Sequence, residues 1–336
     1  MLVLVTAISG YIGSATALAC LRAGHRVRGT LRSEAKATAF RESWKEWEGQ
    51  LEFAIVPDMQ VKGAYDEACV GVDWIAHIAS PFVYGYTDNE RDMLQPAIRG
   101  TLEILESAQR AGSVARIVIT SSFAALQDYA KGVRPGYTYS IADWCPLTYE
   151  DGKNATDQLM VYVASKKLAE EAAWRFMETE KPSFTLSTIC PAFVLGSTPQ
   201  PLHSLNELSV SAAWIRSLID VQELPPTPLP AMNDVSDIAL CHLRALERPV
   251  AAGKRYLTIA HEFSSSQVAH LLHQLFPEQS HRFPPTKNEP PAPHFWWDTK
   301  STEVDLGIEW KSLEQTIKEA GQQIFELEKR EAAARS

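Results

Sequence analysis

The sequence predicts an α/β fold, a doubly wound parallel sheet with a smaller C-terminal cap. Three observations predict it. Short β-branched runs alternate with helical stretches through the first half of the 336 residues, and a glycine-bearing turn follows the first run. After about residue 195 the alternation stops, and two proline-rich loops, Leu224–Pro230 and Phe283–Pro293, bracket further mixed elements. Strands that alternate with helices of this length form right-handed βαβ units and therefore a parallel sheet.

Each strand is expected where a short run rich in β-branched residues is bounded by turn residues. These runs are Leu2–Thr6, Arg26–Thr30, Leu51–Val56, Trp74–Ile78, Arg116–Thr120 and Thr185–Cys190. The helices between them are expected at Ser14–Ala23, Ser33–Glu48, Tyr65–Val70, Asp92–Ala111 and Asp157–Glu180. We predict a first domain at residues 1–194, to which residues 231–260 return, and a cap made of residues 195–230 and 261–336.

Composition and charge argue against several classes of protein. The chain has 32 Lys and Arg against 41 Asp and Glu, a net charge of -9, whereas a nucleic-acid binder usually shows a basic stripe. No apolar run approaches membrane-spanning length, and Met1–Val5 lacks the basic segment of a signal peptide. Five widely spaced cysteines without metal-ligand spacing predict free thiols in a reducing cytoplasm and no metal site. We expect a cytoplasmic monomer or homodimer that binds neither nucleic acid nor membrane.

A glycine-bearing turn lies between the first strand and the first helix, with the sequence Thr6-Ala7-Ile8-Ser9-Gly10-Tyr11-Ile12-Gly13. In a Rossmann-type fold this turn binds a pyrophosphate at the helix N-terminus. Gly10 would let the backbone approach a phosphate, and Gly13 would let the helix pack close to the strand. Ala7 stands where a complete fingerprint has its first glycine, and a methyl group there costs about 1 kcal/mol unless the local φ is negative. The alternative is a plain strand–turn–helix joint.

The end of the second strand distinguishes between nicotinamide cofactors. An NAD site has a carboxylate there for the ribose 2′-hydroxyl, but this chain has no acidic residue before Glu34. Arg32 and Lys36 could instead hold a 2′-phosphate, the arginine through two hydrogen bonds and the lysine as a point charge. For Arg28 we expect surface solvation. The sequence therefore favours NADPH/NADP+ over NAD.

A tyrosine and a lysine four residues apart, Tyr162 and Lys166, lie in a stretch rich in helix formers and without glycine or proline. On a helix they would share one face, and the ammonium would lower the pKa of the phenol, making it a proton donor near neutral pH. A second pair with the same spacing, Tyr149 and Lys153, spans a Glu-Asp-Gly turn signal, so we expect it not to share a helical face. Only the first pair is a candidate for catalysis.

Several separated segments together resemble one family. They are Thr6–Gly13, Arg32-Ser33, Asp58-Met59, Ala79-Ser80-Pro81, Thr120-Ser121-Ser122, Tyr162–Lys166 and Pro191-Ala192-Phe193-Val194. The chain resembles the extended short-chain dehydrogenases/reductases, within them the dihydroflavonol-reductase-like branch, and is most similar to fungal NADPH-dependent aldehyde and ketone reductases. The similarity spans nearly the whole chain.

The resemblance implies a role for each matching residue. It places a catalytic triad on Ser122, Tyr162 and Lys166. It implies that Asp58 meets the adenine amino group with Met59 beside it. Other cofactor contacts are implied for the turn residues Thr6, Ser9, Gly10, Tyr11, Ile12 and Gly13, for Ala79, Ser80 and Thr120, and for Pro191 and Val194 beside the nicotinamide. Ala7 is the departure from the family pattern.

The implied reaction is carbonyl reduction. We select Phe82, Phe123, Gln127, Phe193 and Trp214 as substrate contacts, although apolar residues of this kind can equally be core. A nucleotide-sugar epimerase or dehydratase is the first alternative, but residues 196–230 contain one arginine, Arg216, and no lysine to meet a diphosphate. A non-catalytic NADPH-sensing regulator is the second, against which the Tyr/Lys pair argues.

Overall fold

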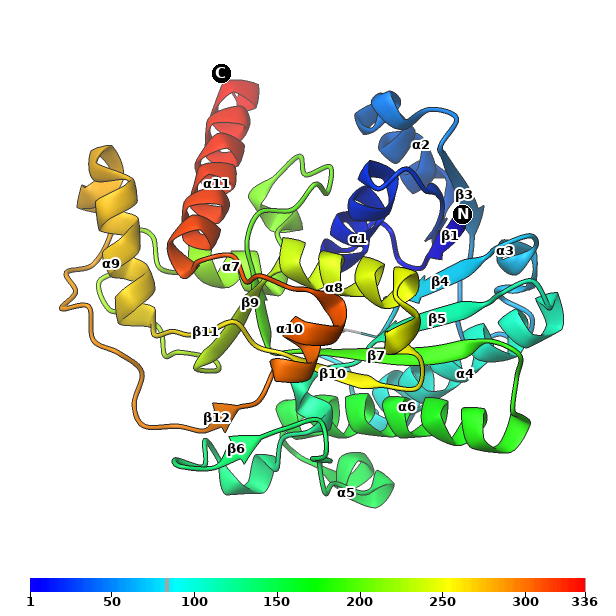
Figure 1. The fold of residues 1–336 in the computed structure, drawn as a ribbon. Helices are drawn as coiled ribbons and strands as arrows, with labels where there is room; N and C mark the ends of the chain where they lie inside the picture. The colour runs from blue at the N-terminus through cyan, green and yellow to red at the C-terminus, as the bar shows by residue number, and fades with distance from the viewer. Residues whose placement is uncertain (82–84, 336) are drawn as a thin grey trace.

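The computed structural model describes residues 1–81 and 85–335, and seven parallel strands form its central sheet (Figure 1). The strand order is β10-β7-β5-β4-β1-β2-β3. From β1 the chain adds β2 and β3 on one side, and then adds β4, β5, β7 and β10 on the other side. The strands are β1 (Leu2–Val5), β2 (Arg26–Leu31), β3 (Leu51–Ile55), β4 (Trp74–His77), β5 (Arg116–Thr120), β7 (Thr185–Pro191) and β10 (Arg255–Thr258). This order and the parallel pairing confirm the predicted doubly wound fold.

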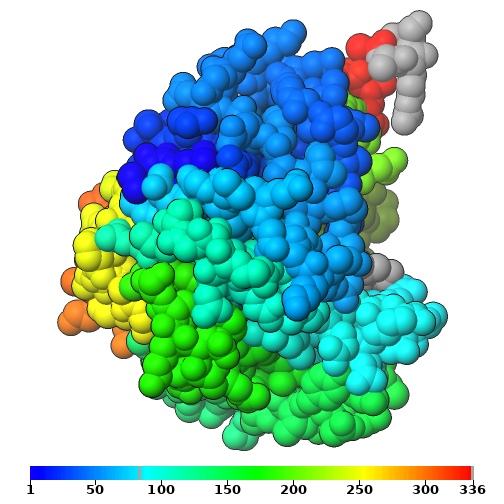
Figure 2. Space-filling view, turned by 90° about the vertical axis from the view of Figure 1, so that its right-hand side faces the viewer, coloured from blue at the N-terminus to red at the C-terminus, as the bar shows by residue number. Residues whose placement is uncertain are grey.

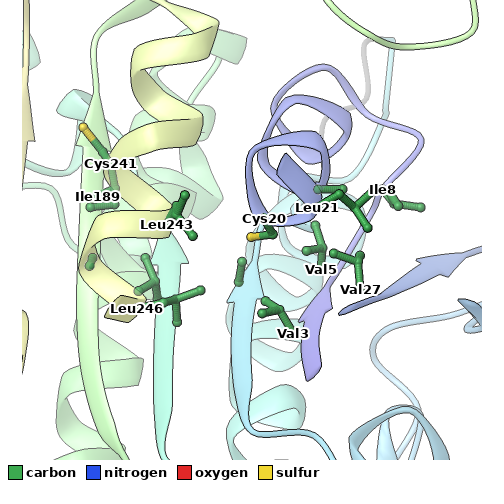
Figure 3. Packing of buried hydrophobic residues seen from close by; sticks show 14 of the residues in the cluster. Val3, Val5, Ile8, Cys20, Leu21, Val27, Ile189, Cys241, Leu243 and Leu246 are labelled. Carbon is green, nitrogen blue, oxygen red and sulfur yellow. The ribbon is translucent and has the colours of Figure 1, made fainter. Parts of the chain in front are cut away.

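Helices cover both faces of the sheet (Figure 1). On one face lie α1 (Tyr11–Arg22), α2 (Glu34–Ser43) and α8 (Val235–Glu247), and on the other lie α3 (Asp66–Cys69), α4 (Gln95–Ala111) and α6 (Gln158–Glu180). In the first of these cores, Cys20 of α1 and Leu243 of α8 pack with Val3 and Val5 of β1 (Figure 3). The space-filling view shows the first third of the chain, blue to cyan, lying above the green residues of α6 (Figure 2).

The C-terminal part adds a smaller sheet and its own core. β8 (Phe193–Leu195), β9 (Ala231–Asp234) and β11 (His261–Glu262) form this sheet, and α7 (Val210–Arg216), α9 (Ser265–Leu275) and α11 (Leu313–Arg335) pack their apolar faces beside it. β12 (Trp296–Trp297) pairs with β6 (Thr138–Tyr139), and α10 (Lys300–Leu306) packs against α8. Between these elements the chain re-enters the main sheet as β10. Of the helices in the described ranges, none has the length and apolarity needed to cross a membrane.

The Tyr149–Lys153 stretch corrects a prediction, because it is a helix, α5 (Tyr149–Asn154), and not a turn. Thr148 and Asp151 form a capping box that starts the helix. Gly152 serves packing: a Cβ there would lie 2.7 Å from the Cβ of Ala164 on α6. Both side chains of the pair contact one carboxylate, that of Glu90, at 2.7 Å from the Tyr149 hydroxyl and 2.8 Å from the Lys153 ammonium. Through Glu90, the pair therefore stabilises the start of the segment that precedes α4.

Candidate active site

Lys166 lies where the carboxyl ends of two central strands meet. α6 begins after Asp157, whose carboxylate accepts the Leu159 amide at 2.9 Å, and it continues unbroken through Tyr162 and Lys166, as predicted. The Lys166 ammonium lies 3.2 Å from the Ser80 hydroxyl beyond β4 and 3.5 Å from the Thr120 carbonyl oxygen at the end of β5. In open parallel sheets this edge is where ligands bind.

Burial lowers the pKa of the Lys166 ammonium. Desolvation lowers the pKa of its ammonium to about 8, while the nearby carboxylate of Glu170 opposes this shift. His77, buried behind it on β4, has its pKa lowered to about 3 by desolvation and by the lysine charge, so it is neutral at physiological pH. Lys166 is therefore charged at neutral pH and loses its proton as the pH rises through about 8.

Ser122 lies two residues beyond β5, at the same end of the sheet. Its hydroxyl caps a short 3-10 turn, Phe123–Ala125, by accepting the Ala124 amide at 3.1 Å. Because the hydroxyl accepts in this bond, its own O–H group stays available as a donor. The Tyr162 ring packs against a core cluster that includes Ala124, so α6 and the turn after Ser122 are in contact.

The glycine turn has the geometry of an anion site. A Cβ on Gly13 would lie 2.1 Å from the Ala7 carbonyl oxygen, so only glycine fits there, and a Cβ on Gly10 would lie 3.2 Å from the same atom. In the described part of the chain, the backbone N–H groups of Tyr11, Ile12 and Gly13 have no acceptor. These groups and the positive end of the helix dipole fit a bound pyrophosphate.

Ala7 has a φ of 52°, which is the left-handed backbone conformation. A positive φ is the case in which a methyl group at this position is costly. For a residue with a Cβ this conformation costs about 1–2 kcal/mol.

We expect Ala7→Gly to raise the free energy of unfolding by about 0.5–1 kcal/mol, because the strain released exceeds the added backbone entropy of glycine in the unfolded chain. Urea denaturation measures it. Ala23→Gly is the matched control, because Ala23 has a φ of -79° and no strain to release. A gain of stability in the control alone would contradict the strain at Ala7.

Two residues predicted to contact the cofactor, Thr6 and Thr120, use their hydroxyl groups in internal hydrogen bonds. The Thr6 hydroxyl accepts the backbone amides of Ile78 at 2.8 Å and Ala79 at 2.9 Å, and it lies 3.1 Å from His77 Nδ1. The Thr120 hydroxyl lies 2.7 Å from His242 Nε2 of α8. Thr6 thereby fixes the loop that contains Ala79 and Ser80. Cofactor contacts of Thr6 and Thr120 stay predictions.

Arg32 and Lys36, predicted to hold a 2′-phosphate, are exposed after β2, and neither makes a hydrogen bond or ion pair to the residues that the structure describes. Arg28, predicted to be solvated, instead binds Glu52 at 2.8 Å and the carbonyl oxygens of Ala68 and Val70. Its role is to join β2, β3 and the end of α3.

Of the two residues predicted beside adenine, one is exposed and the other is partly buried. Asp58 is exposed and accepts the Gln60 amide at 2.9 Å. Met59 packs on α4, where a Cβ at Gly100 would lie 2.0 Å from its methyl carbon. The Met59 side chain therefore packs between α4 and the core beside it, and its place next to adenine stays a prediction.

The predicted substrate residues divide between core and surface. Phe123 is 1% exposed, with its ring centroid 5.0 Å from that of Tyr139 and 4.9 Å from that of Phe295, so it is core and the prediction is wrong. Phe82 lies outside the described residues. Phe193 and Trp214 are partly exposed and meet edge to face at 5.8 Å, and Gln127 is partly buried beside the turn after Ser122.

The sequence did not predict that the segment after β8 would lie on the glycine turn. The Tyr11 hydroxyl donates to the Gly196 carbonyl oxygen at 2.7 Å, and Ser14 and Thr198 share a hydrogen bond of 3.1 Å. The Gln200 side-chain amide donates to the Ser9 carbonyl oxygen. Val194 packs beside Tyr11 and Ile12, and Pro191 ends β7. These contacts join distant segments, and no local pattern indicates them.

Glu170, one turn beyond Lys166, was also missed. It is a buried carboxylate that receives hydrogen bonds from three strands: from Ser121 after β5, Thr188 of β7 and Arg255 of β10. The one available signal was its spacing of four residues from Lys166 on an otherwise buried helix face.

Known proteins resemble this chain over almost its whole length. A model of the NAD dependent epimerase/dehydratase family matches residues 3–259. An oxidoreductase of Schizosaccharomyces pombe is 36% identical over 326 residues, 97% of each chain. The ketoreductase azaE of Aspergillus niger is 32% identical over 95% of this chain and 96% of its own. The structure of the yeast methylglyoxal/isovaleraldehyde reductase Gre2 complexed with NADPH matches with a TM-score of 0.89 and 29% identity, covering 98% of this chain and 100% of that one.

Proposed function

The chain belongs to the NAD dependent epimerase/dehydratase family, and we propose on this basis that it is an NADPH-dependent reductase of aldehydes or ketones. The resemblance to the extended short-chain dehydrogenases/reductases is confirmed by that match and by the fungal reductases of similar sequence. The observation that supports the proposal most is the position of Lys166: its ammonium reaches Ser80 and Thr120 at the strand ends, one helical turn from Tyr162.

NADPH, when bound, supplies the hydride that reduces the carbonyl carbon. The unpaired N–H groups at the start of α1 fit its pyrophosphate, and Arg32 and Lys36 fit its 2′-phosphate. Ser122 donates its hydroxyl hydrogen to the carbonyl oxygen, which gains negative charge as the carbon is reduced. Tyr162 donates the proton to that oxygen. Lys166 stabilises the phenolate that forms and holds ribose hydroxyl groups.

A hydrophobic or aromatic carbonyl compound fits the cap better than a nucleotide-sugar. Phe193 and Trp214 present partly exposed rings beyond the end of β7. Arg216, the one arginine within residues 196–230, is already paired with Asp220 at 3.3 Å and Glu328 at 3.1 Å. A diphosphate would therefore find no free arginine or lysine in this described part of the cap, which disfavours the epimerase or dehydratase alternative.

The test is to mix the purified protein with NADPH and a panel of aryl ketones and aldehydes. We expect loss of NADPH absorbance together with an equal amount of alcohol. Product without net oxidation of NADPH would indicate an epimerase or dehydratase, and NADPH binding without turnover would indicate a sensor.

Arg32→Ala is expected to raise the KM for NADPH by about 10–100-fold and to leave the KM for NADH nearly unchanged, because a charge-assisted hydrogen bond to the 2′-phosphate contributes about 1.5–3 kcal/mol. Steady-state kinetics with both cofactors measure this. Arg26→Ala is the matched control, since Arg26 lies at the opposite end of β2. Equal loss with NADPH and NADH would contradict the assignment of Arg32.

A further inference from the structure

Four elements meet at the carboxylate of Glu170, whose side chain is fully buried. One carboxylate oxygen lies 2.6 Å from the Ser121 hydroxyl. The other accepts from Thr188 at 2.8 Å and from Arg255 at 2.7 Å. A buried carboxylate with this many donors stays ionised, because its hydrogen bonds and its cation offset desolvation, and the pKa of Glu170 is indeed lowered.

The same carboxylate is connected to both segments that contain the candidate catalytic residues. Glu170 follows Lys166 by one helical turn on α6, and Ser121, which it binds, immediately precedes Ser122. Arg255, its cation, is itself held by the carbonyl oxygens of Ile141 and Asp143. The indole of Trp144 also covers the guanidinium of Arg255, 3.7 Å from the ring centroid. The Glu170 carboxylate is thus held by Ser121 and by an Arg255 that is itself fixed, so it has little freedom to move away from Lys166.

We propose that Glu170 is a positioning residue of this site: its buried carboxylate fixes the end of β5 against α6 and keeps the Lys166 ammonium charged at neutral pH. This inference rests on the proposed function for its catalytic meaning, but the charge of Lys166 can be measured without turnover. Because its side chain is fully buried, Glu170 acts through Ser121 and Lys166.

The charges around Lys166 determine whether removal of the Glu170 carboxylate raises or lowers the pKa of the lysine. The ionisable groups that face it are Glu170 and Tyr162 on α6, Cys190 on β7 and His77 on β4, with Arg255 beyond Glu170. The thiol of Cys190 is neutral, because burial raises its pKa, and His77 is neutral as well. Glu170 is therefore the anion that stabilises the ammonium. Its removal also leaves Arg255 unpaired, so both changes lower the pKa of Lys166.

The experiment measures the pH at which Lys166 is half deprotonated, through competitive acetylation by acetic anhydride and mass spectrometry of the peptide that contains it. We expect Glu170→Gln to lower that pH by about one unit. Glu171→Gln is the matched control, because the neighbouring Glu171 is partly exposed and pairs with Lys167 at 2.9 Å. The control should titrate like the wild type. In Glu170→Gln the alkaline limb of kcat/KM should move by the same amount as the lysine titration.

If Glu170→Gln does not fold, the double variant Glu170→Gln/Arg255→Met removes the buried pair together and leaves no stranded cation. We expect the titration of Lys166 to move in the same direction by a smaller amount. An unchanged Lys166 titration in the folded variant overturns the proposal, even if activity falls. A shifted titration in a protein whose wild type reduces no carbonyl compound supports the role of Glu170 and refutes the proposed function alone.

Discussion

Tyr162→Phe is expected to lower turnover by about 10²–10⁴-fold while NADPH binding stays nearly unchanged. The substitution removes the phenolic hydroxyl that donates the proton but keeps the ring, which packs against the cluster between α6 and the turn after Ser122. The start of α1 and the end of β2, which would hold the phosphates, are not touched. The kcat from NADPH depletion and the Kd from a fluorescence titration of NADPH measure the two quantities separately.

The chain contains its own control for this prediction. Tyr149 has the same spacing to a lysine and also lies on a helix, but its hydroxyl is bound to Glu90 at 2.7 Å. Tyr149→Phe should therefore keep turnover near that of the wild type and lose only the hydrogen bonds of its hydroxyl with Glu90 and Gln95. Normal turnover in Tyr162→Phe, or equal losses in the two variants, would end the assignment of Tyr162 as proton donor.

Gly13→Ala is expected to lower the free energy of unfolding by at least about 1–3 kcal/mol and to weaken NADPH binding by more than about 10-fold. The added Cβ would lie 2.1 Å from the Ala7 carbonyl oxygen and 2.9 Å from its carbon, both of them backbone atoms. Relief requires α1 to move away from the turn, and this movement displaces the N–H groups that fit the pyrophosphate. Urea denaturation and an NADPH titration measure the two effects.

Gly10→Ala serves as the comparison, because its Cβ would lie 3.2 Å from the same oxygen and its φ is -85°. It should lose less stability than Gly13→Ala. Together with Tyr162→Phe, these variants separate cofactor binding from proton transfer. A Gly13→Ala protein as stable as the wild type, with unchanged affinity for NADPH, would mean that the turn has no part in cofactor binding.

Six of the seven strands of the central sheet could be predicted because their signal is local, whereas β10 was not among the predicted strands. β5 (Arg116–Thr120) has the predicted bounds, and β7 (Thr185–Pro191) is one residue longer than predicted. Buried parallel strands are short apolar runs bounded by turn residues, so their ends can be read from the sequence. The face shared by Tyr162 and Lys166 could be predicted for a similar reason, since an unbroken run of helix formers fixes the spacing.

Contacts between distant segments could not be predicted. Phe123 is core because Tyr139 and Phe295 pack against it, and nothing in the residues around Phe123 indicates that neighbourhood. Glu170 and Arg255 are 85 residues apart and meet only once β10 joins the sheet. The buried hydroxyl of Thr6 is likewise explained by amides from the end of β4.

The error at α5 has a different cause. The capping box of Thr148 and Asp151 was visible in the sequence, but Gly152 was interpreted as a turn residue. The structure shows that this glycine allows α5 to approach α6 at Ala164. A glycine in a short helical pattern thus had two physical explanations, and only the packing partner distinguishes them.

The most direct test of NADPH-dependent carbonyl reduction is to follow the transferred hydrogen. The protein is incubated with an aryl ketone and NADPH that has deuterium at both C4 positions, and the alcohol is analysed by mass spectrometry. We predict one deuterium on the carbinol carbon of every product molecule from the wild type, and almost no alcohol from Tyr162→Phe. Alcohol without deuterium, or no alcohol from the wild type with any compound of the panel, would contradict the proposed reaction.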